Sequence, residues 1–158
     1  MELPFWQSLS SVLVEWGYPG LFIAAFLAGS ILPFSSEVVL LTLVGIGVNP
    51  VGGVVFATLG NTLGTYTCYL LGYLGKEDWI VRYLKVSPER IEKTRRFLSG
   101  KGALMAFFTF LPTFGELIAI TLGYMRANRW LTFFSMFSGK LIRYVLLLWA
   151  ADGVRSLI

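Results

Sequence analysis

The chain has 158 residues, which suits a single domain, and its composition differs from that of a soluble protein. Apolar residues make up 56% of the chain and charged residues only 14%, whereas a soluble domain carries roughly 25% charged residues. The 21 residues of 16–36 and the 38 residues of 38–75 contain no charge at all. Because a membrane-spanning helix needs about 20 such residues, the composition predicts an integral membrane protein.

The residue types that are missing exclude most enzyme chemistry. With no histidine, the chain has no Ser-His-Asp or Cys-His arrangement and no histidine-ligated metal or haem. Its one cysteine, Cys68, provides neither a disulfide framework nor a redox pair, and its apolar neighbours favour a small buried side chain. The net charge of +4 does not indicate nucleic-acid binding, because most basic residues gather in one segment. We therefore expect no enzymatic activity, no metal and no cofactor.

The first predicted element is a short helix at the membrane interface, over residues 4–15. Its apolar side chains recur at helical spacing, and Trp6 and Trp16 flank it, where tryptophan prefers the boundary between lipid and water. The N-terminus carries no basic stretch, so we expect no cleaved signal peptide.

Three apolar segments follow, over residues 20–32, 37–48 and 51–74. Pro33 separates the first two, because proline removes a backbone hydrogen bond and disfavours helix in the residue before it. Each of these two segments is too short to cross a bilayer. Only the third is an uninterrupted run of sufficient length, at about 1.5 Å per residue.

The segment 75–101 holds eight of the 13 basic residues and four acids. Within it, Ser87, Pro88 and Glu89 have the order of an N-cap, a first-turn proline and a first-turn acid. One face of the helix that follows carries Ile91, Thr94 and Leu98. The pattern predicts an amphipathic linker helix on the membrane surface. The concentration of Lys and Arg indicates the cytoplasmic side, where such a segment attracts anionic lipid.

The second half of the chain follows the same order as the first. Residues 103–111 form an apolar segment too short to span, Pro112 ends it, and residues 117–125 form another. A longer run begins at Asn128 and continues to residue 151. Each half therefore predicts two half-length pieces that meet at a proline, followed by one long helix.

The two halves align without a gap at an offset of 79 residues, with seven identities in the 43 pairs that begin at Leu32. The identities that carry weight are residue types rare in lipid-facing sequence: Pro33 with Pro112, Glu37 with Glu116, Asn49 with Asn128 and Gly60 with Gly139. Proline-broken segments are tolerated at membrane depth where they line a cavity or are buried in protein. We predict an all-α polytopic membrane domain over 1–158, with repeats at about 17–75 and 102–152, each a re-entrant hairpin plus a transmembrane helix, joined by the cytoplasmic linker helix at 76–101.

Glu37 and Glu116 lie at the corners of the two predicted hairpins. An acid at the centre of a membrane helix costs roughly 2.5–3.5 kcal/mol, which a polar cavity, a cationic partner or protonation can offset. One interpretation is that each glutamate caps a broken helix end. The recurrence of the acid at both corners favours a second one, in which both act as protonatable gates.

Lys140 and Arg143 are the cations of the last long helix, three residues apart and therefore on one face. They can pair with Glu37 and Glu116 or bind a phosphate head group, which arginine contacts bidentately. If both hold, the ion pairs form at rest and open when lipid phosphate competes. In the repeat alignment they fall on Asn61 and Gly64, so the second half is cationic where the first is neutral.

Four smaller or junction residues support this pattern. Gly60, Asn61 and Gly64 form a small, polar helix face that permits close helix approach, so that packing and binding both remain open for it. Asn128 lies between Arg126 and Arg129 at a segment junction that we expect to face the interface.

Two sets of motifs resemble those of the DedA family, the SNARE-associated or VTT-domain membrane proteins, and in particular its YqaA-type branch. In the first half these are the residues 31–37, Ile-Leu-Pro-Phe-Ser-Ser-Glu, and 57–64, Ala-Thr-Leu-Gly-Asn-Thr-Leu-Gly. In the second half they are 110–116, Phe-Leu-Pro-Thr-Phe-Gly-Glu, with Gly123 and 139–144, Gly-Lys-Leu-Ile-Arg-Tyr. The resemblance covers roughly residues 17–150.

The resemblance implies a multi-pass protein of the bacterial inner membrane with two opposed re-entrant hairpins, which moves a lipid between leaflets. The implied partners are a phospholipid or undecaprenyl phosphate, with protons as coupling ions. By position, Glu37 corresponds to the family's first-half acid and Arg143 to its late-helix arginine. Glu116 departs from better-known members, which have an arginine shortly after the second-half proline.

Two other functions are compatible with the same residues. A proton- or cation-coupled exporter of a small solute would use the same acids, and a non-transporting scaffold would use the polar residues for assembly alone. A homo-oligomer is compatible with all three.

Overall fold

In the part of the chain that it describes, the computed structural model consists of helices joined by turns and short irregular segments. That part comprises residues 3–30, 35–75, 78, 81–82, 85, 87–99, 101–111 and 114–156. Pro33 and Pro112, the two predicted helix breakers, lie outside these residues.

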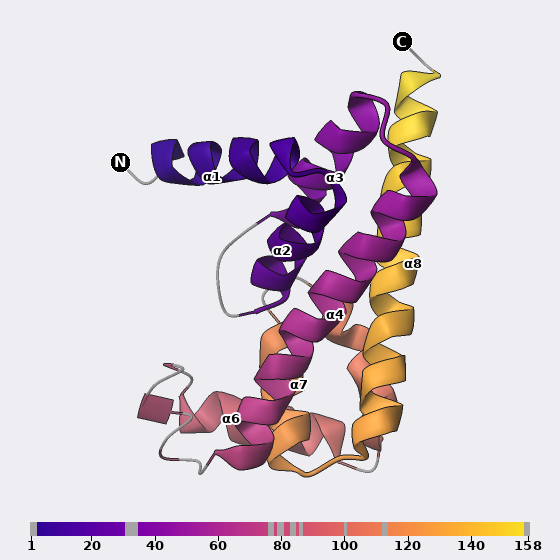
Figure 1. The fold of residues 1–158 in the computed structure, drawn as a ribbon. Coiled ribbons are helices and arrows are strands. Elements are labelled where there is room, and N and C mark those ends of the chain that lie inside the picture. Colours follow the sequence, from indigo (N-terminus) through magenta and orange to yellow (C-terminus); the bar gives the residue numbers. More distant parts are fainter. Residues whose placement is uncertain are drawn as a thin grey trace.

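Two long helices form the axis of the molecule. The helices α4 (Pro50–Leu74) and α8 (Arg129–Arg155) lie side by side and run in opposite directions (Figure 1). Among the described residues, one helix is long and apolar enough by length and composition to cross a membrane, α8 over Arg129–Val154. The helix α4 has 25 residues and no charge, but glycine, threonine and asparagine lower its mean hydropathy.

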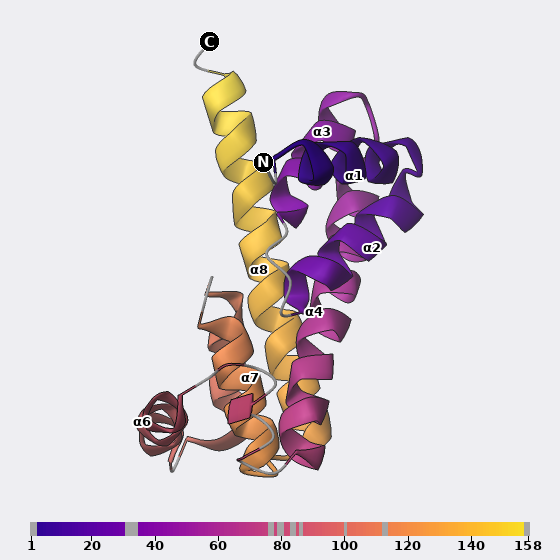
Figure 2. The ribbon, with the colours of Figure 1, turned by 90° about the vertical axis from the view of Figure 1, so that its left-hand side faces the viewer.

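Four short apolar elements flank this pair. The helices α2 (Tyr18–Gly29) and α3 (Ser36–Gly45) lie beside one half of the axis, and η1 (Gly102–Phe110) and α7 (Gly115–Tyr124) beside the other half (Figure 2). The short segments predicted from sequence are therefore present, with shifted ends. The helix α2 begins two residues early, because proline near its start fixes a helical φ. The element η1 is a 3₁₀ helix, which the apolar pattern did not predict.

Two amphipathic helices lie transverse to the axis, in opposite halves of the molecule. The helix α1 (Leu3–Glu15) lies in the half that contains the C-terminus, and α6 (Pro88–Leu98) lies in the other half (Figure 1). The predicted start of α6 is confirmed, because the Ser87 hydroxyl accepts a hydrogen bond from the Arg90 amide at 3.4 Å. Ile91 and Leu98 are buried, as the predicted apolar face requires.

Local structure recurs at the 79-residue offset that the sequence indicates. The bounds of α3 and α7 correspond residue for residue, and α4 and α8 begin at corresponding positions. Asn49 caps α4 by accepting a bond from the Val51 amide at 2.9 Å, and Asn128 caps α8 by accepting one from the Leu131 amide at 3.0 Å. Each cap satisfies an amide that the helix itself cannot.

Glycines bring the short helices against α4. A Cβ at Gly64 would lie 2.1 Å from the Phe26 carbonyl oxygen of α2, and one at Gly123 would lie 1.9 Å from the Tyr69 carbonyl oxygen of α4. The packing of the two halves differs, however. The helix α7 packs extensively along α4, whereas α3 and α8 meet in few places, among them Ser36 and Glu37 at the start of α3. The residue of α3 that corresponds to Gly123 is Val44, so the first half lacks the glycine of this crossing.

Removing either asparagine cap should destabilise the protein moderately. We expect Asn49→Ala and Asn128→Ala each to lower the free energy of unfolding by about 1 kcal/mol, measured by denaturation of the purified protein in detergent. Asn128→Asp retains a side-chain acceptor and serves as the control. Equal stability of the alanine and aspartate variants would contradict the capping role.

Candidate functional site

Two cations of α8 lie at half the length of the long helices, where two short elements end. Arg143 and Lys140 lie near the middle of α8, and Asn61 lies near the middle of α4. The start of α3 and the end of η1 lie at the same level along the long helices, because both contact the Lys140 or Arg143 side chain.

Arg143 joins three elements. Its Nη2 donates to a carboxylate oxygen of Glu37 in an ion pair, and its Nη1 donates to the Phe110 carbonyl oxygen at 3.0 Å. Glu37 occupies the first turn of α3, where a negative charge is favourable, and it also accepts a bond from the Ser35 hydroxyl at 3.1 Å. The side chains of Arg143 and Glu37 remain 30% and 24% exposed, so a small polar group can reach the pair.

Lys140 is enclosed much more completely, with 3% of its surface exposed. Its Nζ donates to Oδ1 of Asn61 and to the Thr109 carbonyl oxygen, the latter at 3.4 Å. Asn61 and Lys140 are 79 residues apart, so equivalent positions of the two halves bond directly to each other. A buried ammonium group requires such partners, because leaving it unpaired would be costly.

The end of η1 provides backbone acceptors to both cations. The carbonyl groups of Thr109 and Phe110 belong to the last turn, where no later amide of the same helix can satisfy them. Positive charges are also favoured at this end of a helix by its dipole. Sequence analysis did not identify these acceptors, since a carbonyl group carries no residue-type signal.

A hydrogen bond of Tyr144 joins the start of α3 to α8. Its hydroxyl lies 2.6 Å from that of Ser36, and both side chains are buried. The sequence analysis quoted both residues in motifs without assigning them a role. The signal in the sequence that could have pointed to this contact is the position of Tyr144 directly after Arg143.

Glu116 is partly buried in the first turn of α7 and forms no hydrogen bond or ion pair with another described residue. It lies close enough to Lys140 to attract it electrostatically. The sequence left open which cation pairs with which acid. In the structure Arg143 pairs with Glu37, whereas Glu116 interacts with Lys140 electrostatically without a direct bond.

The remaining predicted residues lie around this centre. Gly60 and Gly64 are packed against α2, as expected if the small-residue face serves helix packing. Asn128 caps α8 at the end of the bundle, away from the centre.

Thr58 and Thr62 are fully buried on α4, and their hydroxyls have no partner among the described residues. In the same part of the chain, no group of acidic or cysteine side chains could hold a metal ion.

An apolar helical bundle with an ion pair and a buried lysine at the middle of its long helices is a membrane-protein arrangement. The sequence matches the VTT domain over residues 32–152, and the chain belongs to the VTT-domain family. The predicted family is therefore confirmed.

The relatives include proteins of the predicted YqaA type. The inner membrane protein YqaA of Escherichia coli is 32% identical over 126 residues, which cover 79% of this chain and 84% of the relative. An uncharacterised protein of Haemophilus influenzae is 30% identical over 158 residues, covering 91% and 88%. The uncharacterised membrane protein YkoX of Bacillus subtilis is 36% identical over 122 residues, covering 72% and 54%. No solved structure matches the chain.

Proposed function

We propose that the protein is a multi-pass protein of the bacterial inner membrane that translocates a phosphate-bearing lipid, a phospholipid or a polyprenyl phosphate. The observation that carries the proposal is the position of Arg143. Its side chain is 30% exposed, and its guanidinium lies at the middle of the long helices, held by a carboxylate that a phosphate can replace. The planar guanidinium of arginine binds a carboxylate and a phosphate through the same pair of N–H donors.

The proposed architecture is an inverted repeat with two re-entrant hairpins. Three observations support it: the opposite directions of α4 and α8, the placement of α2 with α3 and of η1 with α7 beside opposite halves of the axis (Figure 2), and the recurrence of bounds and caps. The basic helix α6 favours the cytoplasm for its end of the molecule. The names of the relatives from Escherichia coli and Shigella flexneri support an inner-membrane location.

In the proposed mechanism, the lipid phosphate competes with Glu37 for Arg143. Lys140 lies behind Arg143, too enclosed to contact the lipid first, and adds positive potential at the site. Protonation of Glu37 would break the ion pair and free the guanidinium for phosphate, and deprotonation would let the carboxylate displace the lipid again. Glu116, which attracts Lys140 without bonding to it, is the second proposed proton carrier.

The test is lipid flipping in proteoliposomes, with a fluorescent phospholipid and a polyprenyl phosphate assayed in parallel. We expect Glu37→Gln to slow flipping at least about tenfold, which corresponds to about 1.4 kcal/mol of barrier, because no carboxylate remains to release the phosphate. The response to a pH gradient should disappear in the same variant. Glu15→Gln makes the same chemical change at an exposed acid outside the site and should leave the rate unchanged.

Two results would contradict the proposal. Equal flipping by wild type and Glu37→Gln would remove the assigned role of the acid. No flipping of either lipid by well-folded wild type would instead favour a proton-coupled exporter of a small solute.

A further inference from the structure

A second basic site lies at the end of α4 and the start of α8, apart from the central charges. Here a cavity of about 670 Å³ is bounded by aromatic side chains and two arginines, namely Tyr66, Tyr73, Trp130, Phe133, Arg126 and Arg129. Along α8, Arg129 and Lys140 are eleven positions apart, or roughly 16 Å at about 1.5 Å per residue. The cavity is therefore distinct from the proposed translocation site.

The two arginines share one aromatic ring. The guanidinium carbon of Arg126 lies 5.2 Å from the centroid of Tyr73, and that of Arg129 lies 5.3 Å from it. Neither arginine belongs to an ion pair within the described residues. Two like charges held at one ring repel each other, and an anion between them would remove that repulsion.

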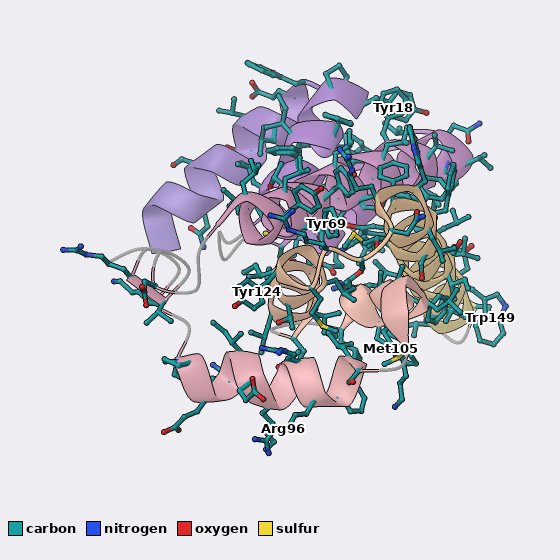
Figure 3. The ribbon with its side chains drawn as sticks, turned by 90° about the horizontal axis from the view of Figure 1, so that it is seen from below. Tyr18, Tyr69, Arg96, Met105, Tyr124 and Trp149 are labelled. Carbon is teal, nitrogen blue, oxygen red and sulfur yellow. The ribbon has the colours of Figure 1, made fainter. Side chains whose placement is uncertain are left out.

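The fold holds this site in place. Tyr69 (Figure 3) is a buried residue whose hydroxyl donates to the Ala127 carbonyl oxygen at 2.5 Å, and this bond fixes the α7–α8 junction to α4. Arg126 has a φ of 55°, a left-handed conformation that glycine prefers. The corresponding residue of the first half is Gly47, so an arginine occupies a position at which the repeat geometry suits glycine.

The two arginines of this cavity have no charged counterparts in the first half of the chain. The first-half counterparts of Arg126 and Arg129 are Gly47 and Pro50, both neutral. The α7–α8 junction lies at the same end as the basic helix α6 (Figure 1). Directly beside the cavity, Trp130 is 74% exposed, and further exposed apolar side chains follow it along α8. A ligand there meets both cationic and apolar surface.

We propose that this cavity binds the head group of an anionic phospholipid. Its two guanidinium groups provide donors for the phosphate, its aromatic walls suit the interfacial depth at which Trp and Tyr lie, and the exposed apolar side chains beside it suit the attached acyl chains. A soluble phosphate ion would use the arginines but leave the apolar surface uncovered.

Lipid binding to the purified full-length protein in detergent, followed by native mass spectrometry, tests this assignment. Phosphatidylglycerol, phosphatidylcholine and inorganic phosphate serve as the probes. Arg126→Gly combined with Arg129→Gln should weaken phosphatidylglycerol binding at least about tenfold, since hydrogen bonds to charged groups contribute at least that factor. The glycine keeps the left-handed backbone unstrained. The single variant Arg129→Lys, which keeps the charge but not the bidentate fork, should cause a smaller loss.

Arg95→Gln with Arg96→Gln removes the same charge from the same end and serves as the control. Neither residue lines the cavity, and Arg96 points away from the body of the protein (Figure 3). An equal loss in the control and in the cavity variants would overturn the proposal, because the effect would then be general attraction to charge. Inorganic phosphate binding as tightly as phosphatidylglycerol would also overturn it, in favour of a soluble anion. Neither outcome depends on lipid flipping.

Discussion

Replacing Arg143 with glutamine is expected to abolish lipid flipping and to destabilise the protein at the same time. The substitution leaves the Glu37 carboxylate beside the Phe110 carbonyl group without its cation. Breaking a fully buried pair costs about 3–5 kcal/mol. Because these side chains are 30% and 24% exposed, we expect a loss of about 1–3 kcal/mol in the free energy of unfolding.

The double variant Glu37→Gln with Arg143→Gln separates the two effects. It removes both charges, so most of the lost stability should return, while flipping should remain absent because no guanidinium is left to bind phosphate. Denaturation in detergent and flipping in proteoliposomes give the two measurements. If flipping returned together with stability, Arg143 would be a structural residue only. Full stability of the single Arg143→Gln variant would show that the pair contributes nothing to the fold.

The second large effect is expected at the crossing of α4 and α7. Gly123→Ala places a Cβ 1.9 Å from the Tyr69 carbonyl oxygen, a backbone atom that cannot move aside without separating the helices. We expect a loss of at least about 3 kcal/mol in the free energy of unfolding, at the upper end of the usual range for overpacking. Denaturation in detergent measures it.

Gly153 provides a control with the opposite sign. It lies in an exposed part of α8, and a Cβ there would meet no atom within 4 Å. Since alanine favours helix over glycine by about 1 kcal/mol, Gly153→Ala should leave stability equal or slightly higher. A Gly123→Ala protein as stable as Gly153→Ala would mean that the helices do not approach as closely as described.

The sequence alone predicted the elements because their signals are local. Apolar runs, prolines and capping residues act within a few positions, so the N-terminal helix α1, the four short segments, α6 and the two long helices are found close to their predicted residues. The 79-residue offset also came from the sequence, as did the family, because the matching residues are uncommon in apolar helices.

The limits of the sequence are clearest at η1 and at the acids. An apolar run of nine residues does not distinguish an α helix from the 3₁₀ helix that forms. The repeat presents Glu37 and Glu116 as equivalent, yet only Glu37 pairs with Arg143 among the described residues. Their equivalence fails because α3 and α7 pack differently on the long helices.

For this protein, then, composition and motif spacing determined the membrane class, the family and the charged residues of interest. Tertiary structure decided which of those charges meet. The Asn61–Lys140 bond, the Thr109 and Phe110 carbonyl acceptors and the ring of Tyr73 shared by two arginines all join segments distant in sequence. Such contacts depend on the crossing positions of whole helices, which the packing of small residues such as Gly123 sets and which no local pattern contains.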